Sequence, residues 1–140
     1  MRTVRDDSGT VYVLLKESSD ACKVRNPETG EECYRDRDDL DPVAGESPLA
    51  TAARAVPEPT RRVLTATPDE RALGLLVELD ERGPLAVRYL IEATDLCESD
   101  LLGVLTEFRA AGLVEQRRVA GERGYAATDL AAEGLAALRD

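Results

Sequence analysis

Residues 97–125, CESDLLGVLTEFRAAGLVEQRRVAGERGY, restrict the fold more than any other part of the sequence. Within them, large apolar residues recur at the spacing of one helix face and are followed by a glycine: Leu101, Val104, Leu105, Phe108 and Gly112. This pattern predicts an amphipathic helix that ends at the glycine. The segments LVEQRRV and YAATD, separated by a turn at AGERG, then predict a β-hairpin. The chain therefore combines helices with antiparallel strands and belongs to the α+β class.

The residues just before this stretch predict a helix with a well-marked start. In TPDE, Thr67 is expected to be the N-cap, Pro68 the first helical residue and Glu70 the partner that completes a capping box. Gly83, followed by a proline, predicts the end of this helix. Its apolar stripe consists of Ala72, Leu75, Leu76 and Leu79.

The segment LAVRYLIEATDL predicts a short strand at Leu85 and Val87, followed by a second helix that carries Leu90 and Ala93. Asp95 stands where the chain must turn sharply, at a position where Gly, Asn or Asp tolerates left-handed geometry. A final helix is predicted over residues 131–138.

The order helix, short strand, helix, tight turn, helix and hairpin in residues 67–140 is that of a winged helix-turn-helix. The stretch LAVRYLIEATDLCESDLLGVLTEFRAAGLVE resembles the ArsR- and MarR-like regulators of prokaryotes, and RAAGLVE stands where those families end the recognition helix and begin the wing. The resemblance implies that this helix enters the major groove of DNA while the wing contacts the backbone or the minor groove. It implies the following base-facing residues: Glu98, Ser99, Asp100, Leu102, Gly103 and Thr106.

These base-facing residues depart from the family pattern, because such regulators commonly carry Gln, Ser, Thr, His or Arg there. Two interpretations fit Glu98 and Asp100. Acids in the first turn offset the positive end of the helix by about 0.3 to 1 kcal/mol each; alternatively, they accept hydrogen bonds from cytosine amino groups. Leu102 fits a contact with a thymine methyl group and a contact with a protein partner equally well.

The wing supplies positive charge. Arg117, Arg118 and Arg123 lie close together in EQRRVAGERG, and Arg88 and Arg109 come from the neighbouring helices. Arginine matches phosphate oxygens with its planar group of donors, so these five residues are the predicted phosphate contacts. The alternative is a solvated wing without a ligand.

Residues 1–43 read as strands. ACKVR and EECYR flank NPETG, in which Pro27 and Gly30 suit the second and last positions of a hairpin loop. This register places Cys22, Val24 and Cys33 on one face, which favours small apolar core cysteines over a redox pair. We expect a small antiparallel sheet, either an SH3-like barrel or a meander. It would sense a ligand, pair with a second copy or bind another protein.

The amino-acid composition changes between the β-domain and the winged-helix region. Residues 44–66 contain prolines between short alanine-rich pieces, which predicts a connecting segment with one or two short helices. The expected organisation is therefore a small β-domain at 1–43, a connecting segment at 44–66 and a winged helix-turn-helix domain at 67–140.

The composition is strongly acidic, with 28 acidic and 18 basic side chains and a formal charge of -10. Only Lys16 and Lys23 of the basic residues are lysine. Such a composition resembles that of proteins from salt-loving archaea, and the whole chain resembles a haloarchaeal winged-helix family. The alternative sources of the acidity are mimicry of an acidic substrate or a basic partner. Concentrated salt also weakens the objection to DNA binding, because the screening length falls to about 3 Å at 1 M.

Several classes of function are disfavoured. No apolar run approaches the roughly 20 residues of a membrane span, and no signal peptide is visible, so we expect a cytoplasmic protein without membrane contact. The three cysteines form no C-x-x-C motif and the chain has no histidine, so we expect no metal or other cofactor. The lack of histidine, of a phosphate-binding glycine loop and of a nucleophile elbow also favours a protein that is not an enzyme.

Two functions stay open. The first is a DNA-binding transcriptional regulator that acts as a homodimer, with double-stranded DNA as its partner. The second is a winged-helix docking module that binds protein through its acidic, leucine-bearing helix. The alanine-rich helices expected around 49–56 and 130–138 are the predicted dimer surfaces.

Overall fold

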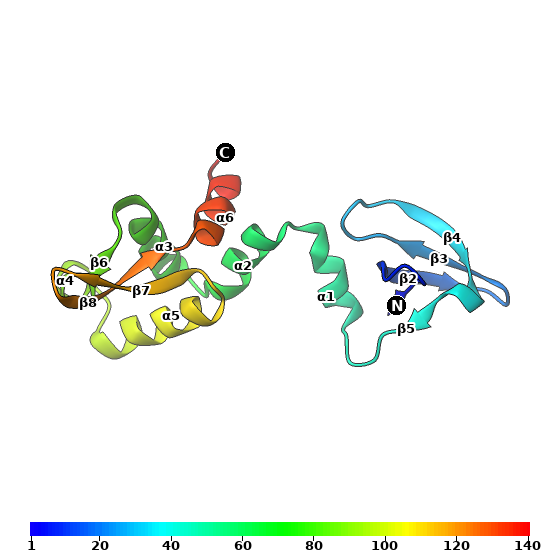
Figure 1. The fold of residues 1–140 in the computed structure, drawn as a ribbon, viewed down its shortest axis with the longest axis horizontal. Coiled ribbons are helices and arrows are strands. Elements are labelled where there is room, and N and C mark those ends of the chain that lie inside the picture. Colours follow the sequence, from blue (N-terminus) through cyan, green and yellow to red (C-terminus); the bar gives the residue numbers. More distant parts are fainter. The chain divides into compact units, whose positions relative to one another are not determined.

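The structure is a computed structural model that describes all residues from Met1 to Asp140. The chain forms two compact units, residues 1–57 and residues 58–140. Figure 1 shows strands in both units and most of the helices in the second. The α+β class predicted from the sequence is confirmed. None of the helices combines the length and the apolar character needed to cross a membrane.

The first unit contains one five-stranded antiparallel sheet. Its strands are β1 (Arg2–Arg5), β2 (Val11–Glu17), β3 (Ala21–Arg25), β4 (Glu32–Asp36) and β5 (Asp41–Pro42). The spatial order is β4-β3-β2-β1-β5, so the first four strands form a meander and β5 returns to pair with β1. A 3-10 helix, η1 (Arg37–Asp39), turns the chain between β4 and β5. β2 contains an irregularity between Leu14 and Lys16 where it pairs with β3.

Both faces of this sheet bury side chains. One face carries an apolar cluster of Val4, Tyr12, Leu14, Cys22 and Val24, with Leu40 packed against it. On the alternate positions Thr3 and Val13 are also buried. Helix α1 (Pro48–Ala52), capped by Ser47 and followed by the 3-10 helix η2 (Ala53–Ala55), packs against β1 and β2. The hydroxyl groups of Thr3 and Thr51 are hydrogen-bonded at 2.7 Å, which fixes α1 to the sheet.

The predicted β3–β4 hairpin is confirmed in register, since Val24 is paired with Cys33 and Cys22 with Arg35. Gly30 has a φ of 76°, the left-handed geometry that glycine adopts without strain. The expectation that both cysteines lie in the core is wrong for Cys33. Cys22 is buried but Cys33 is exposed, because β4 is an edge strand whose side chains are left largely uncovered on both faces.

A buried carboxylate closes the turn between β1 and β2. Asp6 Oδ1 accepts hydrogen bonds from the Ser8 hydroxyl at 2.7 Å and from the backbone N–H groups of Ser8 and Thr10. Asp6 Oδ2 accepts from the Tyr12 hydroxyl at 3.2 Å and from Arg35 at 3.3 Å. Because every contact leads to a residue of the same unit, the cluster stabilises the sheet.

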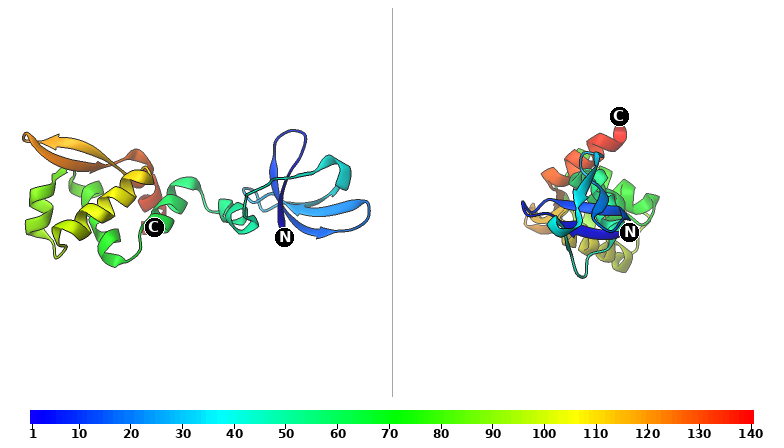
Figure 2. Two further views of the ribbon diagram at one scale, coloured as in Figure 1. Left: turned by 90° about the horizontal axis from the view of Figure 1, so that it is seen from below. Right: turned by 90° about the vertical axis from the view of Figure 1, so that its right-hand side faces the viewer.

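The second unit contains five helices and a three-stranded antiparallel sheet. The helices are α2 (Glu58–Ala66), α3 (Glu70–Arg82), α4 (Val87–Ala93), α5 (Glu98–Ala110) and α6 (Asp129–Arg139). The strands are β6 (Leu85–Ala86), β7 (Val114–Val119) and β8 (Glu122–Ala127), in the order β6-β8-β7. Figures 1 and 2 show the β7–β8 hairpin extending beside α5.

The core of the second unit comes from the predicted stripes. All four stripe residues of α3 are buried, as are three of the four in α5, while Val104 is half-buried. Leu90, Leu113 and Leu135 complete the core from α4, the start of the hairpin and α6. The predicted ends at Gly83 and Gly112 are confirmed, and Gly112 has a φ of 76°.

The predicted capping box at the start of α3 is wrong. Asp69 is the N-cap, and its carboxylate accepts from the backbone N–H of Ala72 at 2.9 Å. Thr67 donates its hydroxyl to the carbonyl oxygen of Val63 at 2.6 Å, at the end of α2. Because the Thr67 hydroxyl is bonded to the end of α2, it does not cap α3. Asp69, the next residue with a side chain suited to capping, takes this position.

Three further local expectations differ from the structure. Val87 begins α4 instead of extending β6. Asp95 does not adopt left-handed geometry; it forms an ion pair with Arg71 at 3.2 Å that joins the α4–α5 turn to α3. The hairpin turn consists of Ala120 and Gly121 alone, both with positive φ, so β8 begins at Glu122 and includes residues expected in the turn.

The residues expected to form a separate connection are divided between the two units. Helix α1 packs on the sheet of the first unit, whereas α2 packs on α6 of the second. At the α2–α6 crossing, Gly134 lies against Pro59 and Val63. Figure 1 shows α2 and α6 side by side.

Candidate nucleic-acid interface

Helix α5 exposes the predicted base-facing residues. Glu98, Ser99, Asp100, Gly103 and Thr106 are exposed and Leu102 is half-buried. They face away from the core because Leu101, Leu105 and Phe108, on the alternate face, are fully buried. The helix therefore presents these residues together on a face that is open to solvent.

Some polar groups of this face already form hydrogen bonds within the helix. Thr106 donates its hydroxyl to the carbonyl oxygen of Leu102 at 2.8 Å. Cys97 is the N-cap residue, but its side chain does not accept from a backbone N–H. Glu98 and Asp100 lie in the uncapped first turn and form no ion pair, an arrangement in which they offset the positive end of the helix.

The hairpin places two arginines on one face. Arg118 is paired with Arg123, and Gln116 with Tyr125, across β7 and β8. Because residues directly opposite in a sheet and residues two apart in a strand share a face, all four side chains lie on the same side of the hairpin. Both arginines are exposed and neither pairs with a carboxylate.

Tyr125 anchors this side of the hairpin. It is buried, and its hydroxyl oxygen accepts from Arg123 at 3.0 Å and from Gln116 at 3.3 Å. Burial raises the pKa of Tyr125, but these hydrogen bonds and the positive charges of Arg123 and Arg109 outweigh it, so that its pKa is lowered. Arg109, in the last turn of α5, therefore lies near enough to Tyr125 for its charge to act on that hydroxyl.

The two other predicted phosphate contacts belong to ion pairs. Arg117 contacts Glu115 at 2.9 Å, and Arg88 contacts Glu122 at 3.4 Å. The five predicted phosphate contacts therefore fall into two groups, those that pair with a carboxylate and those that do not. We call Arg109, Arg118 and Arg123 the unpaired arginines, since their hydrogen bonds, where they form any, go to neutral groups. A shallow hollow of about 350 Å³ runs along the hairpin between Gln116, Arg117, Arg118 and Arg123.

The local charge differs from that of its surroundings. Residues 58–140 contain 16 acidic and 10 basic side chains, so the unit as a whole is negative. The unpaired arginines are therefore a positive area on an acidic unit. Such an area can attract an anion with several oxygen atoms, because arginine donors are fixed in a plane and remain charged.

Sequence reasoning did not identify Gln116 and Tyr125 as part of this surface. The alternation of side chains along a strand predicts which residues share a face, but the cross-strand partners can be assigned only when the position of the turn is known. A turn at AGERG begins the second strand at Tyr125 and leaves Arg123 outside the ladder, whereas the observed two-residue turn brings Arg123 opposite Arg118. Only Gly121 marked this turn, because two-residue turns favour Asn-Gly or Asp-Gly and alanine is unusual at the positive φ of Ala120.

Comparison with protein families identifies the family of this chain. Residues 1–139 match the model of DUF7346, described as a family of unknown function, and the chain belongs to this family. Among solved structures, the chain is similar to the transcriptional regulator HlyU from Vibrio vulnificus CMCP6. The similarity has 27% sequence identity and a TM-score of 0.49, and it covers 65% of this chain and 91% of HlyU. A comparison with curated proteins found no match.

Proposed function

We propose that residues 58–140 form a winged helix-turn-helix domain that binds double-stranded DNA, and that the protein is a transcriptional regulator. The order α3, β6, α4, α5, β7 and β8 is the order of that domain. In this assignment α5 is the recognition helix and the β7–β8 hairpin is the wing. The observation that carries the proposal is that Arg118 and Arg123 share one face of the hairpin and have no carboxylate partner, while α5 exposes a face to solvent.

The ion pairs of the hairpin support a division of the predicted phosphate contacts into two groups. Arg118 and Arg123 offer donors and net charge to phosphate oxygens, and the charge of Arg109 also acts on Tyr125, which belongs to both the hairpin and the core. Arg88 and Arg117 have their charges compensated by Glu122 and Glu115. Since phosphate binding depends on net positive charge at the contact, the first group supplies most of the affinity.

This difference defines a matched experiment. The test variant combines Arg118→Gln with Arg123→Gln, and the control variant combines Arg88→Gln with Arg117→Gln. Both remove the same formal charge from the same unit. Binding to random-sequence duplex DNA is measured by fluorescence anisotropy over a range of potassium chloride concentrations. We expect the first pair to weaken binding to all sequences and to flatten the salt dependence by about one unit per lost contact. We expect the control pair to have the smaller effect; equal effects, or none from either pair, would contradict the proposal.

The residues of α5 are proposed to decide sequence preference. If Glu98 and Asp100 only stabilise the helix end, Glu98→Gln and Asp100→Asn raise the affinity for every DNA sequence. If they accept from cytosine, the preferred bases change instead. Selection of binding sites from a random library separates these two results.

A docking module is the second candidate, and one observation favours it. The first turn of α5 carries two carboxylates without partners, next to the half-buried Leu102. DNA affinity that is unchanged in both arginine pairs, together with loss of a purified partner on Leu102→Ala, would support this candidate over the regulator.

We further propose a homodimer in a high-salt cytoplasm. The large side chains of Leu49 on α1 and Leu138 on α6 are exposed, within the two helices predicted to form dimer surfaces. For the first unit, the return of β5 to β1 after a 3-10 turn supports an SH3-like, partly open barrel. Light scattering in molar potassium chloride tests the dimer, and a monomer mass at micromolar concentration would exclude it.

A further inference from the structure

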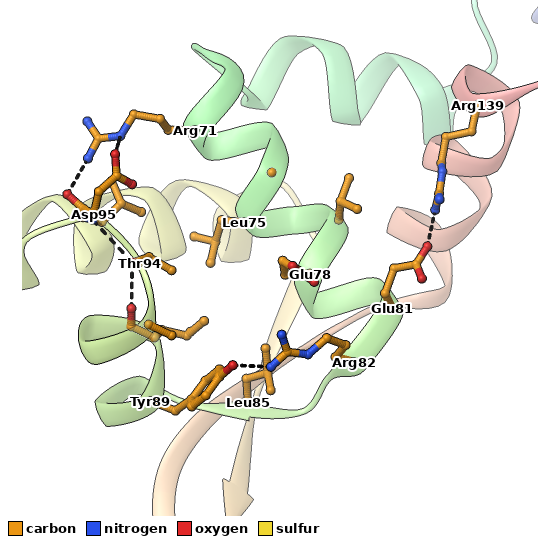
Figure 3. Close-up of a pocket in the computed structure, with 15 residues that line it drawn as sticks. Arg71, Leu75, Glu78, Glu81, Arg82, Leu85, Tyr89, Thr94, Asp95 and Arg139 are labelled. Carbon is orange, nitrogen blue, oxygen red and sulfur yellow. Dashed lines mark hydrogen bonds and ion pairs between the residues drawn. The ribbon is translucent and has the colours of Figure 1, made fainter.

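The second unit contains a cavity of about 700 Å³ that the proposed DNA surface does not use. It lies between α3 and α4 and reaches the α4–α5 turn and the end of α6 (Figure 3). Its apolar lining includes Leu75, Leu90 and Leu96, which are buried members of the core, and Leu85. The volume lies within the range of small-molecule sites, and an apolar floor fixed by the core is typical of them.

The charged groups of this cavity are balanced, unlike those of the unit as a whole. Three arginines and three carboxylates line it: Arg71, Arg82, Arg139, Glu78, Glu81 and Asp95. Four of them form two ion pairs, Arg71 with Asp95 at 3.2 Å and Arg139 with Glu81 at 2.6 Å. One positive and one negative group, Arg82 and Glu78, are left without an ion-pair partner.

Arg82 and Glu78 stand one helical turn apart on α3. Arg82 donates to the Tyr89 hydroxyl and lies 5.3 Å from the centre of that ring, which holds its guanidinium at one end of the cavity (Figure 3). The hydrogen bond with Tyr89 is the largest influence that raises the pKa of Arg82, and the charge of Glu78 also raises it. The two charges therefore act on each other, yet no hydrogen bond or ion pair joins them.

We propose that this cavity binds a free α-amino acid with a large apolar side chain. The ligand carboxylate accepts from Arg82 and Tyr89, the ammonium group donates to Glu78, and the side chain packs on Leu75, Leu85 and Leu90. Glu78 and Arg82 are both exposed at the edge of the cavity, so a simple anion can pair only with Arg82 and a simple cation only with Glu78. A zwitterion can pair with both groups at once, and the apolar floor favours a ligand with a large apolar side chain.

Titration of the full-length protein with L-phenylalanine tests this proposal in the absence of DNA. We expect saturable shifts of the Gly74 amide and of the Leu75, Leu85 and Leu90 methyl signals in NMR spectra, with the affinity confirmed by calorimetry. Phenylalaninamide lacks the carboxylate and N-acetylphenylalanine lacks the ammonium group. Each loses a charge-assisted contact, and glycine loses the apolar burial, so all three should bind at least about 10-fold more weakly.

Two variants assign the contacts. Arg82→Gln and Glu78→Gln should each weaken phenylalanine binding at least about 10-fold. Arg25→Gln in the first unit and Glu133→Gln on α6 make the same chemical changes away from the cavity and should bind as the unaltered protein does. Circular dichroism confirms that each variant is folded.

Three results would overturn the proposal: no saturable shift up to about 10 mM phenylalanine, equal binding of the two blocked analogues, or unchanged affinity in both cavity variants. Because binding is measured without DNA, these outcomes are independent of the arginine experiment on the hairpin. A protein that binds DNA but no amino acid keeps the proposed function and loses only the cavity assignment.

Discussion

A single methyl group at the α2–α6 crossing should destabilise the second unit. Gly134 is buried in α6, and a Cβ atom there would overlap the carbonyl oxygen of Pro59. It would also lie 2.7 Å from the Pro59 carbonyl carbon and 2.7 Å from Val63 Cγ2. Ordinary contacts begin at 3.4 Å, so the helices must separate by about 0.7 Å to relieve the two 2.7 Å contacts and by more to clear the carbonyl oxygen. The Pro59 atoms belong to the backbone and cannot rotate away.

Two opposing terms set the size of the effect. Alanine is better than glycine inside a helix by about 1 kcal/mol. Overpacking of a well-packed site costs about 1 to 3 kcal/mol, and a backbone obstacle favours the upper end. We therefore expect Gly134→Ala to lower the free energy of unfolding by about 2 kcal/mol. Gly103→Ala is the matched control, because Gly103 is exposed on α5 with nothing within 4 Å of the position that the new methyl group would take, and it should stabilise by about 0.5 to 1 kcal/mol.

Urea unfolding followed by NMR measures both variants. The amide signals of Gly112 and Gly121 report on the second unit, and those of Gly9 and Gly30 report on the first. With a slope of about 2 kcal/mol per molar urea, the midpoint of Gly134→Ala should fall by about 1 M. A midpoint that stays unchanged or rises would refute the packing argument, as would an equal loss of stability in Gly103→Ala.

Three further predictions concern other parts of the molecule. The hydrogen bond from the Ser8 hydroxyl, then those from Thr10 and Tyr12, lower the pKa of Asp6 below its ordinary 3.8 against the raising effect of burial. The ionised Asp6 carboxylate therefore stabilises the first unit above pH 3.8, and this stabilisation is lost as the pH falls through the lower pKa of the folded state. Asp6→Asn should destabilise the first unit at pH 7, and it should do so much less at a pH below the folded-state pKa. Urea unfolding at both pH values measures the difference. Ala120 has a φ of 52°, which is unfavourable for alanine, so Ala120→Asn should stabilise the hairpin by about 0.5 to 1 kcal/mol in thermal unfolding; a lower midpoint would contradict this. Molar potassium chloride should raise the thermal midpoint, because the charge of -10 repels itself less when screened, and a salt-independent midpoint would remove this electrostatic argument.

The sequence by itself determined the elements whose signals are local. The stripe of α3 and most of that of α5 were predicted because apolar residues at helical spacing leave one way to bury them together. The register of the β3–β4 hairpin followed from a short loop that starts at Asn26 and ends at Gly30, since loop length fixes which residues lie opposite each other. The exposed face of α5 followed in the same way, as the complement of its buried stripe.

Only the tertiary structure decided the features that depend on a neighbour. Thr67 and Asp69 are both good N-cap residues, and the end of α2 determined which of them caps α3. Cys22 and Cys33 share a face of the sheet, but burial requires a covering layer, and the edge strand has none.

The arginines of the candidate interface show the same division. The sequence placed five of them near the hairpin, but it could not say which would meet a carboxylate. That depends on the two-residue turn, which puts Arg123 opposite Arg118, and on the approach of α4, which brings Arg88 to Glu122. Composition and periodicity are properties of one segment of the chain. The partner of a charged side chain is instead set by packing between segments, so the net charge of this surface is decided only by the tertiary structure.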